Sequence, residues 1–421
     1  MRKLNAEMGC LPSEIKFNIL SRLPVRMLCR CKSVSKDWLQ IISDPYFLKL
    51  HQEQSKRNKQ LLLLNQGLGD DEDDTRPQFV HFLATSLEKE VHFGLGGFIC
   101  GYVYMIPSGH DLICLINRGH FHIFSPSFIK GIRLPQAKLS NCLEMDAGFG
   151  YIPSQNEYKL VHMFDVNPNP FAYSIKCEIL TLTDGATIGA DAWKEIKQEC
   201  PFKVSGWGVL ANNKFYWIVS VVCTPCEEKS IVSLDLETET FDFIPHPHYV
   251  SYLEGNDMFL VELKGQLCFI DTFAYPPVTD IWVLVDPVRK IWVKEHRIDL
   301  TMLQGFDDEQ TQVLIHGYEN GELVISSQQK SLEFYDTRRK IFRKGEDLNL
   351  LWHTGICLYT ESFFSLGIVD SGFLRQLTTT LLRLQRTSVV GDVYTAEQIA
   401  PDLDFESILF QTTATFQGQC L

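Results

Sequence analysis

A Cys-x-x-Cys pair and a His-x-His pair are the residues of this chain whose spacing is closest to that of a chemical site. Cys223 and Cys226 have the spacing of a zinc knuckle or a redox dithiol, and His246 and His248 could offer two imidazole ligands. No second C-x-x-C stands at zinc-site spacing, and Pro247 between the histidines is typical of a turn. The sequence contains no Walker-type phosphate loop, no H-E-x-x-H and no G-x-S-x-G. We therefore expect no catalytic residues, no metal site and no cofactor.

Charge and hydropathy exclude several kinds of partner. The formal net charge of −13 argues against general nucleic-acid binding. The sequence has no run of ~18 apolar residues, so it predicts no membrane-spanning helix. The first ten residues lack the apolar core of a signal peptide, and the thirteen cysteines have no regular spacing. We therefore expect reduced thiols in the cytosol or the nucleus. The acidic run at residues 70–74 predicts a solvated loop, with attraction of a basic partner as the alternative.

Three short amphipathic helices are predicted in residues 11–55, after a flexible N-terminus at residues 1–10. The Leu11-Pro12 and Leu23-Pro24 pairs each place a proline in the first turn of a helix, where its missing N–H costs nothing. The apolar positions of each helix are predicted to share one inward face: Ile15, Ile19, Leu20 and Leu23; then Met27, Leu28 and Cys31; then Val34, Trp38, Ile41 and Ile42. Ser33 is expected to cap the third helix and Asp44-Pro45 to end it. A unit this small needs a partner for its apolar stripe, either the rest of the chain or another protein.

This helical pattern resembles an F-box, the motif that docks on the Skp-type adaptor of an SCF ubiquitin ligase. The resemblance implies binding to that adaptor and, through it, to a cullin. It also implies the residues that make the contact or support it from the core: Leu11, Pro12, Ile15, Ile19, Leu23, Pro24, Leu28, Val34 and Trp38. The chain departs from the pattern at Met27, where relatives usually have a small polar residue. An ordinary helical cap packed on the body of the protein is the alternative that spacing leaves open.

Residues 60–370 predict an all-β domain built from a repeat. Asp235, Asp286 and Asp336 recur at intervals of about 50 residues, each between an alternating apolar strand and an aromatic six residues later. An Asp at such a turn can accept hydrogen bonds from the backbone that follows it, and the aromatic is expected to fill the gap between neighbouring sheets. A second hairpin precedes each copy, so one period predicts the four-stranded blade of a β-propeller. Six blades are favoured over seven, and a strand within residues 356–367 is expected to complete the first blade.

The same region resembles the F-box-associated domain of plant F-box proteins, which is kelch-like. The resemblance rests on residues 148–161, 193–196 and 214–220 and on the repeats at Asp235 and Asp286. Together the two resemblances imply a non-catalytic substrate receptor of an SCF-type E3 ubiquitin ligase, which binds a target protein through its β domain and leads it to ubiquitination and degradation. A non-degradative interaction protein that binds the adaptor is one alternative. A propeller enzyme is the less favoured one.

Two long loops of the β domain mix proline with aromatic side chains, which are common interface anchors. The residues in question are Phe171, Tyr173, Phe273 and Tyr275. We predict that they contact a target protein, although such side chains also pack beneath their own loops. After the β domain the repeat stops, and residues 371–421 predict a divergent, weakly ordered tail.

Overall fold

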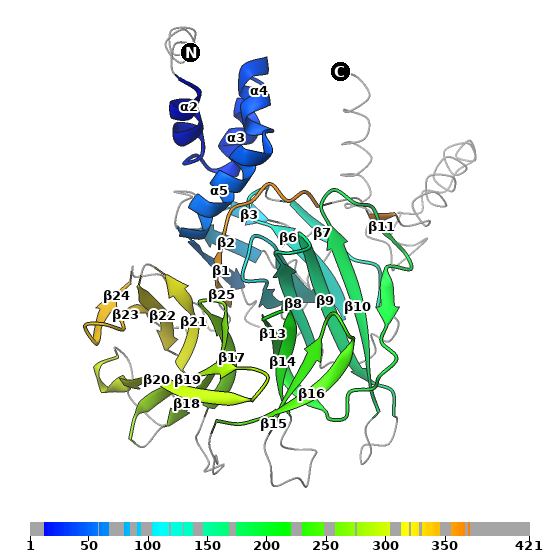
Figure 1. The fold of residues 1–421 in the computed structure, drawn as a ribbon, viewed down its shortest axis with the longest axis vertical. Coiled ribbons are helices and arrows are strands. Elements are labelled where there is room, and N and C mark those ends of the chain that lie inside the picture. Colours follow the sequence, from blue (N-terminus) through cyan, green and yellow to red (C-terminus); the bar gives the residue numbers. More distant parts are fainter. Residues whose placement is uncertain are drawn as a thin grey trace, which may run out of the picture.

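In the part of the chain that it describes, a computed structural model shows a group of α-helices, α2–α5, at one end of a ring of β-sheets (Figure 1). It describes residues 12–57, 59–66, 80–84, 91–93, 103–117, 119–128, 130–137, 146–167, 174–219, 230–247, 257–273, 276–303, 313–319, 321–327, 331–345, 355–366 and 369–370. The acidic run at 70–74, the Cys223/Cys226 pair and residues 371–421 therefore lie outside the described residues. None of the helices that it describes is long and apolar enough to cross a membrane.

The helical unit (residues 12–57) contains four helices where three were predicted: α2 (Ser13–Leu20), α3 (Val25–Cys31), α4 (Lys36–Ile42) and α5 (Pro45–Arg57). Pro45 begins α5 because a proline is tolerated in the first turn of a helix. Asp44 Oδ1 accepts hydrogen bonds from the backbone N–H groups of Tyr46 (2.7 Å) and Phe47 (3.3 Å) and so caps the new helix. Asp44-Pro45 is thus both the end of α4 and the start of α5.

The cap of α4 also differs from the prediction. Ser35 rather than Ser33 caps this helix, since its Oγ accepts the N–H of Trp38 at 3.2 Å. Ser33 Oγ instead donates to the carbonyl of Arg30 at the end of α3 (2.8 Å). The four helices close around a small core of Leu20, Leu28, Ile41, Ile42 and Phe47.

Among its described residues, the β domain consists of six four-stranded units. The first holds β25 (Gly355–Tyr359), β1 (Gln60–Gln66), β2 (Val80–Ala84) and β3 (Val91–Phe93), and the second β4 (Tyr104–Pro107), β5 (Ile113–Asn117), β6 (His120–Ser125) and β7 (Lys130–Arg133). The third holds β8 (Asp146–Ile152), β9 (Glu157–Asp165), β10 (Ile175–Thr183) and β12 (Trp193–Glu195), and the fourth β13 (Val204–Ala211), β14 (Lys214–Val219), β15 (Ser230–Asp235) and β16 (Thr240–Pro245). The fifth holds β17 (Asp257–Leu263), β18 (Gln266–Phe273), β19 (Val278–Asp286) and β20 (Ile291–Asp299), and the sixth β21 (Val313–Glu319), β22 (Glu322–Ser327), β23 (Ser331–Asp336) and β24 (Ile341–Lys344). A short 3₁₀ helix, η2 (Leu300–Met302), follows β20, and β11 (Ile188–Gly189) pairs in parallel with β26 (Val369–Asp370).

The six units form a closed ring, which is the arrangement of a β-propeller. The first strand of each unit contacts the first strand of the next, in the order β25, β4, β8, β13, β17, β21 and back to β25. One parallel bridge between Gly148 and Gly208 joins the third and fourth units into an eight-stranded sheet. The favoured count of six blades, rather than seven, is what the structure shows.

A strand from the far end of the chain completes the first blade, as predicted. β25 pairs antiparallel with β1, with Leu62 opposite Cys357 and Gln60 opposite Tyr359. The predicted segment was longer than this strand, because only residues 355–359 pair. Residues 360–366 leave the sheet as an extended strap (the C-terminal strap) that runs toward the helical unit and the third blade.

The repeated Asp residues form the predicted turns. Asp235, Asp286 and Asp336 each accept two backbone N–H groups from the residues two and three positions later, at 2.8–3.1 Å. Each turn ends in a non-glycine residue with left-handed backbone, with φ of 55° at Glu239, 59° at Lys290 and 58° at Lys340. The short hydrogen-bonded turn thus repeats with the blade.

Aromatic side chains tie neighbouring blades together, as the repeat predicted for Trp292. Trp292 Nε1 donates to the carbonyl of Pro245 in the preceding blade, and Trp193 Nε1 donates to the carbonyl of Pro135 in the same way, both at 3.0 Å. Pro245 is the last residue of the outer strand β16 of its blade, and Pro135 follows the outer strand β7. The indoles therefore supply a polar contact as well as apolar packing between blades.

Candidate functional site

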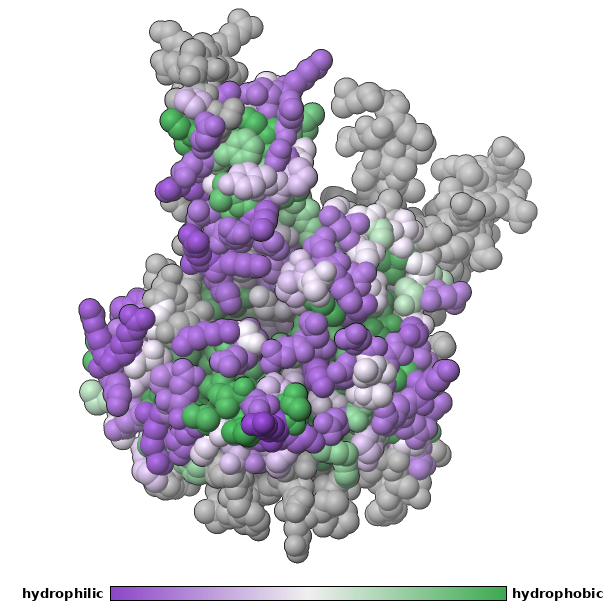
Figure 2. Space-filling view, in the orientation of Figure 1, coloured by the Kyte–Doolittle hydropathy of each residue, from purple (hydrophilic) through white to green (hydrophobic). Residues whose placement is uncertain are grey.

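Five aliphatic side chains on the helical unit remain at the surface although a core lies beneath them. Ile15, Ile19, Met27, Val34 and Leu39, which we call the exposed helical face, are between 41% and 46% exposed. Figure 2 shows hydrophobic side chains at the surface of α2–α4, bordered by hydrophilic ones. A grouped apolar surface of this kind is typical of a protein-binding site rather than of a solvated cap.

The border of this face is basic although the chain as a whole is acidic. Four basic residues of the α2–α4 region are exposed, Arg22, Arg26, Arg30 and Lys36, against two exposed acids, Glu14 and Asp37. Lys16 is largely buried and pairs with Asp37 at 2.9 Å. The face therefore suits a partner with an apolar centre and acidic residues around it, because complementary charges favour encounter and register.

The structure divides the residues implied by the F-box resemblance into two layers. Ile15, Ile19 and Val34 lie on the surface together with Pro12, whereas Leu28 is fully buried in the helical core. Leu23, Pro24 and Trp38 are half-buried, and Leu11 lies outside the described residues. The first helix thus does not present one inward face: Leu20 points into the core while Ile15 and Ile19 do not.

Met27 was predicted to point inward, and this was wrong. Its side chain is 45% exposed, while the neighbouring Val25 and Leu28 fill the interior. Leu39 was not predicted and joins the same surface. The phase of a seven-residue helix with few polar residues is poorly determined by periodicity, so only packing decides which apolar residues remain outside.

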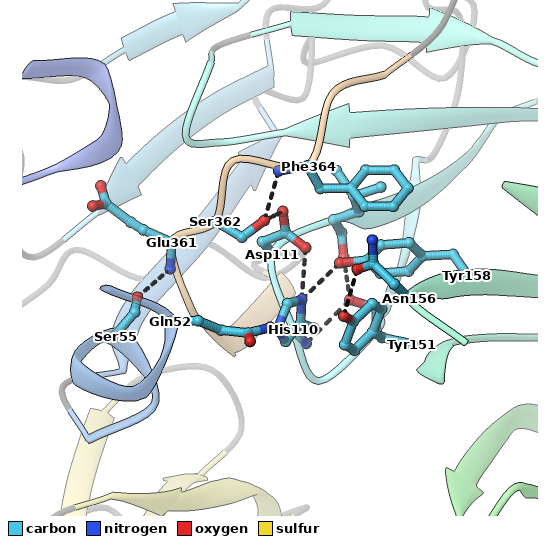
Figure 3. Close-up of polar contacts among 12 residues, drawn as sticks. Gln52, Ser55, His110, Asp111, Tyr151, Asn156, Tyr158, Glu361, Ser362 and Phe364 are labelled. Carbon is cyan, nitrogen blue, oxygen red and sulfur yellow. Dashed lines mark hydrogen bonds and ion pairs between the residues drawn. The ribbon is translucent and has the colours of Figure 1, made fainter. Parts of the chain in front are cut away.

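The C-terminal strap fastens the helical unit to the propeller. Glu361 Oε2 accepts the backbone N–H of Val25 at 3.0 Å, and the backbone N–H of Glu361 donates to Ser55 Oγ on α5 at 2.6 Å (Figure 3). Burial raises the pKa of the Glu361 carboxyl, and the hydrogen bond from Val25 opposes that shift. One residue of the strap therefore holds both α3 and α5.

Phe363 of the strap packs into the helical unit. Its ring centroid lies 5.3 Å from that of His51, edge to face, and the Lys32 ammonium lies 5.1 Å above it. Burial lowers the pKa of His51, so its ring is neutral near pH 7. The Nε2–H of His51 donates to the carbonyl of Leu23 (3.0 Å), which locks α5 against the turn between α2 and α3.

A buried polar network continues from the strap into the second and third blades (Figure 3). The Ser362 hydroxyl donates to Asp111 Oδ2, and Asp111 Oδ1 lies 2.7 Å from His110 Nδ1, which also lies 2.8 Å from the Tyr158 hydroxyl. His110 stacks on Tyr151 with ring centroids 4.0 Å apart. Its Nε2 lies 3.4 Å from Nε2 of Gln52 on α5. The strap, α5 and two blades therefore meet at one joint, which fixes the exposed helical face relative to the propeller.

The histidine and cysteine side chains that could bind a metal or react as nucleophiles are not grouped into such a site in the described part of the chain. There, no group of three His, Cys, Asp or Glu residues is placed to hold a metal ion. The ring of His246 packs 4.8 Å from Phe269, and His248 lies outside the described residues. Burial raises the pKa of Cys200 to about 11 and of Cys268 to about 12, so both are thiols rather than reactive thiolates.

Only one of the four aromatic residues that were predicted to bind a target is among the described residues. Phe171, Tyr173 and Tyr275 lie outside the described residues. Phe273 is half-buried at the end of β18, where it pairs with Val278. Its contact with a target stays a prediction.

Comparison with known proteins gives two family matches. A family described as F-box associated beta propeller domain matches residues 77–347, and one described as F-box-like matches residues 8–49. Similar proteins of Arabidopsis thaliana include "Putative F-box protein At4g38870", which is 26% identical over 70% of this chain and 69% of its own length. "Putative F-box protein At1g47790" is 25% identical over 80% of this chain and 84% of its own length, and "F-box protein At3g07870" is 24% identical over 82% and 88%.

Proposed function

This chain belongs to the F-box proteins that carry an F-box associated β-propeller domain, and on that premise we propose that it is the substrate-recognition subunit of an SCF-type E3 ubiquitin ligase. The helical unit binds a Skp-type adaptor and, through it, a cullin. The propeller binds a target protein, which is then ubiquitinated and degraded. The chain performs no bond chemistry itself and acts by raising the local concentration of the target at the ligase.

The exposed helical face is the observation that carries this proposal. Apolar side chains such as Ile15 and Ile19 stay at the surface over an otherwise complete core, with basic residues around them. An adaptor with an apolar groove and an acidic border would cover this surface. The contacts that join the C-terminal strap, α5 and the second and third blades support the same function. They hold the helical unit in place on the propeller, and a receptor must hold its target at a set distance from the enzyme that delivers ubiquitin.

Strand direction favours one end of the propeller for the target. The first strands run toward the helical unit, since β25 leads into the strap and β4 leads to His110, which lies beside Gln52 of α5. The second strands therefore end at the opposite end, and Phe273 at the end of β18 lies there. We assign the target to this opposite end because the helical unit and its adaptor occupy the other.

The first experiment is co-purification of the full chain with a Skp-type adaptor and cullin. An Ile15→Asp/Ile19→Asp variant should lose the adaptor, at least tenfold in affinity, because it places two charges in an apolar contact. A Val288→Asp/Ile341→Asp variant is the matched control, since these two side chains are exposed on the propeller, 89% and 53%. Failure of the folded wild-type chain to hold the adaptor would refute the proposal.

The degradative part of the proposal needs its own measurement. A bound target should have a longer half-life in cells that express the Ile15→Asp/Ile19→Asp variant in place of the wild type. An unchanged half-life, with adaptor binding intact in the wild type, would support the non-degradative alternative instead.

A further inference from the structure

The centre of the propeller contains a cavity of about 430 Å³ that the proposed function does not use. It is lined by residues from the first strand of every blade: Ile106, Phe149, Leu210, Leu260, Leu314 and Leu358 are examples. Its size falls within the range of about 300–1,000 Å³ that is typical of small-molecule sites. It runs along the channel, from Met258 near the start of β17 to Glu262 near its end.

Some apolar side chains that line the cavity are only partly covered by the packing of the blades. Met258, Leu260 and Leu314 are only half-buried, although each lies on an inner strand. Leu314 in particular belongs to none of the hydrophobic clusters between the blades that the structure describes. Apolar groups that face an internal cavity hold water poorly and favour an apolar occupant.

Three polar side chains in the lining, those of Ser108, Glu262 and His316, already have partners within the protein. Ser108 Oγ donates to the carbonyl of Leu112 at 2.5 Å, and Glu262 Oε1 accepts the backbone N–H of Gly265. His316 Nε2 lies 2.7 Å from Ser326 Oγ, and burial lowers the pKa of His316, so the ring carries no charge near pH 7. Lys59 and Glu262 have opposite charges, so the lining has no net formal charge. An ionic ligand would find no excess of opposite charge here.

From this geometry we propose that the central channel binds a compact, uncharged and largely apolar small molecule. The occupant contacts β25 through Ile356 and Leu358 and also contacts Lys59, which precedes β1. β25 and β1 pair to close the ring, so a bound molecule bridges the two ends of the propeller at its closure. Binding therefore stabilises the closed ring and raises its unfolding temperature.

The test uses the full chain and the uncharged naphthalene dye prodan, whose emission reports an apolar environment. We expect saturable binding of one dye per chain and a concentration-dependent rise in the melting temperature. Leu314→Trp and Leu260→Trp fill the channel from two different strands, and either variant that folds should bind the dye at least tenfold more weakly. Leu314→Ala enlarges the same space and should retain binding.

A control separates the channel from the exposed helical face. Ile15→Ser/Ile19→Ser removes apolar surface from that face and should leave dye binding unchanged. The proposal is overturned if the wild-type chain shows no saturable binding, or if the dye leaves the Ile15→Ser/Ile19→Ser variant but stays on the folded channel-filling variants. These results do not depend on adaptor binding, so they are independent of the proposed ligase function.

Discussion

The backbone N–H of Val25 donates a 3.0 Å hydrogen bond to the carboxylate of Glu361, a residue 336 positions later in the chain. Val25 starts α3 in the helical unit, and Glu361 follows the strand that closes the propeller. The contact ties an N-terminal helix to the last strand of the ring. It makes the orientation of the helical unit depend on closure of the propeller.

Glu361→Ala should loosen this joint. The substitution leaves the N–H of Val25 without its acceptor in a largely buried place, at a cost of about 1–3 kcal/mol. Faster hydrogen exchange at the Val25 amide and a lower melting temperature would show the loss. Glu361→Gln keeps an oxygen acceptor and should cost less; equal effects of the two substitutions would argue against the role of this bond.

The carboxyl of Glu361 should also add a pH dependence. Burial raises its pKa in the folded state above the unfolded value. Its contribution to stability is therefore fully present below the ordinary carboxyl pKa and is lost as the pH rises through the raised pKa. Melting temperatures across that window should vary less in Glu361→Gln than in the wild type, and an identical slope in both would contradict the assignment.

Two histidines should oppose that trend. Burial lowers the pKa of both His122 and His316 to about 4. Because the folded state then binds fewer protons than the unfolded state, stability is full above pH ~6.5 and falls as the pH drops toward 4. His316→Gln should flatten this fall in a thermal-unfolding series between pH 7 and pH 4.5, since it cannot be protonated. A fall that is just as steep in the variant would exclude His316 as its source.

The inter-blade indoles allow a matched comparison. Trp193→Phe and Trp292→Phe each remove one hydrogen bond of 3.0 Å to a proline carbonyl. Trp193 is 6% exposed, whereas the Trp292 bond lies at the surface, where water replaces the lost donor. We expect a cost of about 1–2 kcal/mol for Trp193→Phe and less than about 1 kcal/mol for Trp292→Phe. Denaturant unfolding measures both, and the reverse order would contradict this account.

Gly208 should tolerate no side chain. A Cβ there would overlap the indole ring of Trp217, at the bridge where β13 meets β8. Gly208→Ala should therefore destabilise the chain by about 1–3 kcal/mol through overpacking. Gly189→Ala is the control, because a Cβ at Gly189 meets no atom within 4 Å. Similar melting temperatures for the two variants would show that the tryptophan moves aside at little cost.

Local pattern was enough to predict much of this protein. Two Leu-Pro pairs marked the first helices, and the Asp repeat at about 50 residues marked the blades, their turns and their number. These features depend on neighbours within a few residues, so the sequence reports them directly. The helix at Pro45 was missed because a proline that ends one helix can begin the next. The kelch-like description stays a prediction.

Only the tertiary structure decided which apolar residues face outward and how the two parts join. Ile19 and Leu20 are neighbours of similar hydropathy, yet one is 41% exposed and the other 1%, because Leu20 packs into the core that the four helices share and Ile19 does not. The contact of Val25 with Glu361 and the cavity beside Leu314 likewise depend on closure of the ring. Periodicity records how a segment meets its nearest neighbours, whereas a contact between residues hundreds of positions apart leaves no spacing in the sequence. The type and order of the elements were therefore determined locally, and the joint, the outward face and the channel were determined by packing.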